Sequence, residues 1–83
     1  MRTRANKRSA REQLGENVRA RREEHGLSQE ALAEQLGFHR TYISQLERSK
    51  LNVTLDTLER IASYFQVPLQ ALFDEHPARL GRD

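Results

Sequence analysis

The segment at residues 28–47, SQEALAEQLGFHRTYISQLE, constrains the fold most, because it lays out two short helices around a tight turn. Ser28 can cap the first helix through its hydroxyl group, and apolar residues then recur at the three- and four-residue spacing of one buried face. These residues are Leu32, Ala33 and Leu36. Gly37 predicts the end of this helix, because glycine adopts the left-handed conformation of a helix C-terminus at almost no cost.

The second helix is predicted to begin near His39, with Ile43 and Leu46 as its buried stripe. At about 100° per residue, the polar residues fall on the opposite side of the helix. They are Arg40, Thr41, Ser44, Gln45 and Arg48. Ala33 is expected where the two helices cross, because only a small side chain lets them approach closely. Two helices arranged in this way form a helix-turn-helix motif.

The composition limits the chain to one small domain. With 83 residues, it is expected to have a modest core that a partner subunit would help to stabilise, and no ligand-sensing domain fits beside it. The absence of cysteine excludes disulfides and thiolate zinc sites, so a reducing cytoplasm is the expected setting. No apolar run follows the basic N-terminus, so we expect neither a secretory signal nor a membrane anchor. We therefore predict a cytoplasmic protein without a metal, a cofactor or a small-molecule ligand.

Positive charge is concentrated at the N-terminus. The formal net charge is +2, and five of the fourteen basic residues lie within the first eleven residues, where no acidic residue occurs. They are Arg2, Arg4, Lys7, Arg8 and Arg11. We predict a flexible basic arm at residues 1–10, a folded domain at residues 11–75 and a frayed tail at residues 76–83. The arm could lie along a DNA backbone or in a minor groove, or it could be a solvated tail.

Periodic apolar residues predict three further helices. The first spans about residues 10–25, with Leu14 and Val18 on its buried face. Another follows Thr54, which can cap it, and carries the strongest amphipathic stripe of the chain. That stripe consists of Leu55, Leu58, Ile61, Ala62 and Phe65. Pro68 fits the first position of a final short helix, and no segment alternates as a strand would, so the predicted fold class is all-α with five short helices.

Most of the chain resembles the Cro and phage-repressor family of helix-turn-helix regulators, also called the xenobiotic-response-element type. Residues 14–29, LGENVRARREEHGLSQ, are similar to its first helix and turn, and residues 46–73, LERSKLNVTLDTLERIASYFQVPLQALF, to its loop and last two helices. The strings HRTYIS, LER and NVTL resemble the small controller proteins of restriction-modification systems, and they also occur in phage-type repressors. The resemblance implies a lambda-repressor-like domain that binds an inverted-repeat operator through the major groove as a homodimer. It also implies a transcription regulator that acts on its own promoter.

The outward residues of the motif's second helix are candidates for reading double-stranded DNA. Arg40 can pair bidentately with guanine O6 and N7, and Gln45 can pair with adenine N6 and N7. Thr41 and Ser44 can contact a base edge, a thymine methyl group or a phosphate. The alternative is that these four side chains form an ordinary solvated helix face.

Phosphate contacts are expected on either side of this recognition helix. Gln29 stands at a helix start, where free N–H groups and the helix dipole favour an anion, and the resemblance gives it the same task. The resemblance also implies a loop against the DNA backbone, with contacts from Arg48, Lys50 and Asn52. His39 stands where the family more often has a capping Ser, Thr or Asp. Either the missing cap is tolerated or the imidazole contacts DNA.

Other residues have structural roles in the family that the chain resembles. Arg22 and Glu47 match positions that form an ion pair between the first helix and the recognition helix, so we interpret both as structural. Leu69, Leu72 and Phe73 carry more apolar surface than a five- or six-residue helix can bury on one side, so some of it either closes the core or meets another subunit. The resemblance implies a two-fold dimer through these three residues, with the recognition helices about 34 Å apart.

No enzyme signature is present. The chain has no glycine-rich phosphate loop and no GxSxG sequence, and its histidines lack the i, i+4 partner of a helical metal site. We therefore predict no catalytic residues, and a nucleoid-associated regulator of a bacterium or phage. The rival interpretation is a helix-turn-helix protein-interaction module, such as an antitoxin or a bridging coactivator, which would show no salt-sensitive DNA binding.

Overall fold

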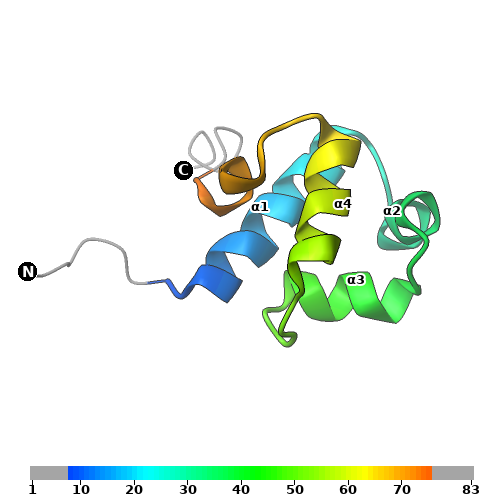
Figure 1. Ribbon diagram of the computed structural model, residues 1–83. Coiled ribbons are helices and arrows are strands. Elements are labelled where there is room, and N and C mark those ends of the chain that lie inside the picture. The colour runs from blue at the N-terminus through cyan, green and yellow to red at the C-terminus, as the bar shows by residue number, and fades with distance from the viewer. Residues whose placement is uncertain (1–7, 76–83) are drawn as a thin grey trace, which may run out of the picture.

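The computed structural model describes residues 8–75, and this part of the chain is helical (Figure 1). The predicted tail, and the predicted arm up to residue 7, lie outside the described residues. The elements are α1 (Ala10–Glu24), α2 (Gln29–Leu36), α3 (Arg40–Glu47), α4 (Leu55–Phe65) and a short 3₁₀-helix, η1 (Leu69–Phe73). The all-α prediction is confirmed. No helix in the described part of the chain has the length and apolar composition needed to cross a membrane.

Side-chain caps fix where three of the helices begin. Ser28 and Thr54 each accept a hydrogen bond from the backbone N–H three residues further on, as predicted. Ser9 caps α1 in a reciprocal arrangement: the N–H of Glu12 donates to its hydroxyl at 3.1 Å, and its own N–H donates to the Glu12 carboxylate at 3.0 Å. The folded domain therefore includes Ser9 and Ala10, and it starts earlier than the predicted boundary at residue 11.

Left-handed residues end α2 and α4. Gly37 follows α2 with φ 79°, which confirms the predicted stop, and glycine adopts this angle without a Cβ clash. Gln66 follows α4 with φ 60°, where a residue with a side chain is sterically disfavoured. The N–H of Val67 donates to the Ala62 carbonyl at 3.0 Å, so hydrogen bonding at the helix end holds this turn.

The last element, at the place of the predicted final short helix, is a 3₁₀-helix. Its backbone bonds span three residues, with the N–H of Ala71 donating to the Pro68 carbonyl at 2.9 Å. The buried side chain of Asn17 on α1 donates to the carbonyls of Ala71 at 2.9 Å and Asp74 at 2.6 Å, and Gln13 donates to Asp74 at 3.2 Å. The last carbonyls of η1 are thus satisfied by α1, and five residues offer little length for an α-helical ladder.

The core lies where α1, α2, α3, α4 and η1 converge, and its residues come from every element. The buried apolar residues are Leu14, Val18, Leu32, Ala33, Leu36, Ile43, Leu46, Leu58, Ile61, Ala62, Phe65 and Leu72. The predicted stripes on all four α-helices face this core, apart from Leu55, which is 69% exposed. In Figure 1, α2 lies at one side of the molecule, η1 lies beside α1 at the other, and α3 runs below.

Gly15 lets α1 and α3 approach each other closely. A Cβ atom at this position would lie 2.6 Å from the carbonyl oxygen of Glu47 and 2.9 Å from that of Leu46. Both neighbours are backbone atoms at the end of α3, so they cannot rotate away as a side chain can. In the sequence, Gly15 has no signal other than being a helix-disfavouring residue on the buried face of α1, so this close contact could not be predicted.

We expect Gly15→Ala to lower the free energy of unfolding by about 1–3 kcal/mol, measured by urea denaturation, because the new methyl group must push α3 away from α1. Ser63→Ala is the control: it places a better helix former on the exposed face of α4 and should change stability by less than about 0.5 kcal/mol. A Gly15→Ala protein as stable as the parent would show that the helix contact is not tight.

Candidate nucleic-acid interface

The two sides of α3 differ in burial as the sequence predicted. Ile43 is 0% exposed and Leu46 is 2% exposed, so the apolar side is fixed to the core. On the other side, Arg40 and Thr41 are exposed, whereas Ser44 and Gln45 are half-buried. The four candidate base-contacting residues therefore share one accessible face of a firmly packed helix.

The loop after α3 carries the next group of candidates. Arg48, Lys50 and Asn52 are all exposed. Between them, Ser49 takes a left-handed backbone conformation with φ 65°, which turns the chain sharply at the end of α3. The N–H of Lys50 donates to the Gln45 carbonyl at 2.8 Å and holds this turn. The structure therefore places a short basic loop directly after the C-terminal end of α3.

Arg22 and Glu47 form a buried ion pair between α1 and α3. The Arg22 Nε and Nη2 atoms donate to the two Glu47 carboxylate oxygens at 2.6 and 3.0 Å. Their side chains are only 11% and 3% exposed. The hydrogen bond to Glu47 raises the pKa of the Arg22 guanidinium, against the effect of burial, so the guanidinium keeps its charge. Arg22 also donates to the Leu27 carbonyl at 2.8 Å, which ties the α1–α2 turn to the same group.

Gln29 belongs to this ion-pair network. It is the first residue of α2, half-buried, and its amide Nε2 donates to the Glu47 carboxylate at 3.0 Å. An amide nitrogen carries two hydrogens, so this bond leaves the second one available to an incoming phosphate. The network also balances the charge of the one carboxylate at the end of α3.

His39 precedes α3 without capping it. Its backbone is extended, and its side chain makes no capping hydrogen bond. The imidazole is exposed, so the structure leaves it accessible from solvent. Tyr42, one turn further on, directs its hydroxyl toward Thr57 on α4, with 3.5 Å between the two oxygen atoms. The first turn of α3 therefore has a contact with α4 but no side-chain cap at its N-terminus.

The three predicted dimer residues have different environments. Leu72 is 0% exposed and packs in the core, so it follows the first of the two expected alternatives, closing the core, and does not reach a subunit surface. The reason is that η1 turns this side chain between α1 and α4, where it closes the core. Leu69 and Phe73 are half-buried and keep apolar surface on the outside.

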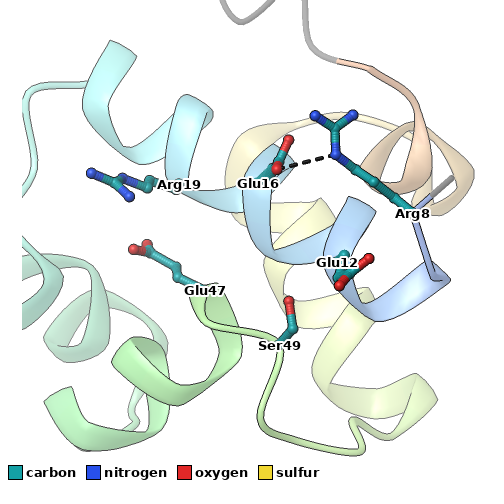
Figure 2. A pocket seen from close by; sticks show the side chains of 6 residues that line it. All are labelled: Arg8, Glu12, Glu16, Arg19, Glu47 and Ser49. Carbon is teal, nitrogen blue, oxygen red and sulfur yellow. Dashed lines mark ion pairs between the residues drawn. The ribbon is translucent and has the colours of Figure 1, made fainter.

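A surface pocket between α1 and the end of α3 is lined by charged side chains (Figure 2). Its lining residues are Arg8, Glu12, Glu16, Arg19, Glu47 and Ser49. Arg8 pairs with Glu16 at 3.1 Å and with Glu75 at 3.6 Å, so ion pairs within the chain join its two described ends. Because two arginines and three glutamates line the pocket, it lacks the excess positive charge of a phosphate site. Nor do the described residues contain a cluster of metal-ligating side chains.

Comparisons with known proteins identify relatives for most of this chain. The HTH_3 helix-turn-helix family matches residues 18–72. The chain is 60% identical over 45 residues to the control protein C.SmaI of Serratia marcescens, a match that covers 54% of each chain. It is 43% identical over 62 residues to the control protein C.BamHI of Bacillus amyloliquefaciens, covering 74% of this chain and 76% of that protein. The chain thus spans about half the length of the first relative and three quarters of the second.

A solved structure shows the same arrangement of helices. The restriction-modification controller protein C.AhdI of Aeromonas hydrophila superposes with a TM-score of 0.68 and 34% sequence identity, covering 75% of this chain and 90% of that one. These relatives are named as control and controller proteins, and none of these names describes an enzyme.

We expect Glu47→Gln to lower the free energy of unfolding by about 3 kcal/mol in urea denaturation, because it leaves the Arg22 guanidinium buried without a counter-charge. Arg19→Gln is the matched comparison. It breaks an exposed pair with Glu23, whose side chains are 55% and 38% exposed, and should cost less than about 1 kcal/mol. Equal effects of the two substitutions would contradict a structural role for the buried pair.

Proposed function

The chain belongs to the HTH_3 helix-turn-helix family of transcription regulators and is similar to restriction-modification controllers, and from this premise we propose that it binds an inverted repeat in DNA as a homodimer. The proposed site lies in its own promoter, so that the protein regulates its own synthesis. The observation that carries the proposal is the accessible polar face of α3, presented by a helix whose apolar side is fixed in the core.

In this proposal α3 enters the major groove and reads base edges. Arg40 lies in the first turn of α3, the part of a recognition helix that reaches base edges first. A bidentate contact of Arg40 with guanine, and another of Gln45 with adenine, would each contribute about 1–3 kcal/mol of discrimination. Thr41 and Ser44 complete the reading face with shorter side chains that can contact a base, a methyl group or a phosphate.

Phosphate contacts on both sides of α3 would hold it in the groove. On one side is the N-terminus of α2, with its free N–H groups and the second amide hydrogen of Gln29. On the other is the exposed loop with Arg48, Lys50 and Asn52. His39 is a further candidate, because its exposed imidazole makes no cap. These contacts set the position of the helix and carry no sequence information.

Self-association would use the outer surface of η1. Leu69 and Phe73 keep apolar surface there, whereas Leu72 belongs to the core. A two-fold dimer through this surface would place two α3 helices on one face of the duplex, about one helical turn apart. The operator would then be an inverted repeat.

We expect Arg40→Ala to reduce binding to an operator selected from a random duplex pool by about tenfold to a hundredfold, with little effect on a scrambled duplex. Lys50→Ala should weaken binding to both duplexes alike and reduce the salt dependence, because a phosphate contact is lost without a base contact. Unchanged affinity and sequence preference in Arg40→Ala would eliminate the reading role. Absence of any salt-sensitive DNA binding would favour a protein-interaction module instead.

For the dimer, we expect Leu69→Asp to shift sedimentation equilibrium from dimer toward monomer, because the new carboxylate would be buried between two copies. The circular dichroism spectrum should stay helical, since Leu69 lies outside the buried core. A parent protein that remains monomeric at micromolar concentration and on its selected duplex would refute the two-fold arrangement.

A further inference from the structure

Three side chains join the turn of the helix-turn-helix motif to α4. Arg60 on α4 donates from Nη1 to the carbonyl of Leu36, the last residue of α2, at 2.9 Å. The Cζ atom of Arg60 also lies 4.8 Å from the centre of the Phe38 ring, in the turn. The Phe38 ring in turn lies 4.7 Å from the Tyr42 ring on α3. We call Arg60, Phe38 and Tyr42 the α4 clamp.

Gly37 caps the end of α2 through its backbone, but neither helix end at the turn has a charged or side-chain stabiliser of its own. The last turn of α2 has no basic residue of its own, so the Arg60 guanidinium provides the positive charge that favours a helix C-terminus. The first turn of α3 has neither a side-chain cap nor an acidic residue. The ring contact between Phe38 and Tyr42, four residues apart, therefore fixes how the chain enters α3, although the N–H groups of the first turn stay without a side-chain cap.

The position of Tyr42 connects the α4 clamp to DNA reading. Tyr42 lies two residues after Arg40 and one after Thr41, within the same first turn of α3. Its ring is held by Phe38, and its hydroxyl is 3.5 Å from Thr57 Oγ1 on α4. Thr57 on α4 therefore contacts the first turn of α3 directly, whereas Arg60 on α4 reaches it through the Phe38 ring.

We infer that Arg60 is a positioning residue for DNA recognition. It fixes the α2–α3 turn and, through Phe38 and Tyr42, the first turn of α3. This inference rests on the proposed reading role of α3. Loss of the α4 clamp should let this turn shift relative to the rest of the domain, so that contacts with base edges suffer while phosphate contacts, which tolerate small shifts, persist.

Arginine is needed here because a planar guanidinium can lie over an aromatic ring and donate from its edge to a carbonyl at the same time. The ammonium group of lysine is a compact point charge and cannot do both in one geometry. Arg60→Lys therefore breaks the link that the α4 clamp makes between α4 and the turn, but it keeps the positive charge. The substitution thus separates positioning from any general attraction of this residue to DNA.

The test compares binding of Arg60→Lys and the parent protein to the selected operator and to a scrambled duplex at the same salt concentration. We expect about a fivefold to tenfold loss on the operator, with the scrambled duplex and the salt dependence unchanged. Phe38→Leu, which keeps apolar volume but removes the ring, should reproduce this loss. Combining it with Arg60→Lys should add little, because both act through the same contact.

Two controls make the outcome decisive. Ser9→Ala removes the cap of α1, far along the chain from the α4 clamp, and should lower thermal stability while leaving the ratio of operator to scrambled binding unchanged. Arg40→Ala must lower that ratio, or the reading role itself fails. If Arg40→Ala lowers the ratio but Arg60→Lys does not, or if Arg60→Lys weakens both duplexes equally, the positioning role of Arg60 is overturned and the proposed function stands.

Discussion

The close contact between α1 and α3 governs the rest of this structure. Because glycine has no side chain, α1 packs at Gly15 directly against the carbonyl groups at the end of α3. Within the same contact, the Arg22–Glu47 ion pair joins the two helices with two hydrogen bonds. An apolar contact alone would allow α3 to slide or rotate. A bidentate charged pair fixes both the position of α3 along its axis and its rotation about that axis, because the guanidinium and the carboxylate must meet in one plane.

The same contact solves an electrostatic problem for a helix that we propose to enter a DNA groove. Glu47 ends α3, where its charge would oppose binding, yet the carboxylate is 3% exposed and accepts hydrogen bonds from Arg22 and Gln29. The negative charge of Glu47 is thereby balanced by hydrogen-bond donors within the protein. Gln29 in turn is oriented at the N-terminus of α2 before any ligand arrives. One buried acid therefore joins α1, α2 and α3 at the edge of the proposed interface.

Polar side chains on buried faces organise the opposite end of the domain. Asn17 is 1% exposed and donates to two carbonyls of the chain that closes the core after α4. It also accepts a hydrogen bond from Arg21 at 2.8 Å, so its amide is satisfied on both sides. By fixing η1 against α1, Asn17 and Gln13 set the direction in which Leu69 and Phe73 present their apolar surface.

The local chemistry of the sequence determined where the helices lie and which way they face. Ser28 and Thr54 act as caps through bonds spanning three residues, and Gly37 stops α2 through its own backbone freedom, so neighbours in the chain suffice to predict them. The burial of Ile43 and Leu46 follows from helical periodicity in the same way. Periodicity also predicted the accessible face of α3, and the reading roles assigned to that face remain predictions.

Only the tertiary structure decided what depends on residues far apart in the chain. The role of Gly15 depends on a carbonyl at Glu47, and Leu72 fills the core because η1 is turned inward. Arg60 looks like an ordinary exposed residue of α4 until the fold brings the end of α2 and the Phe38 ring beside it. Such contacts leave no periodic or local signal in the sequence. The packing of the helices determines which residue each side chain meets, and the spacing of residues along one helix does not.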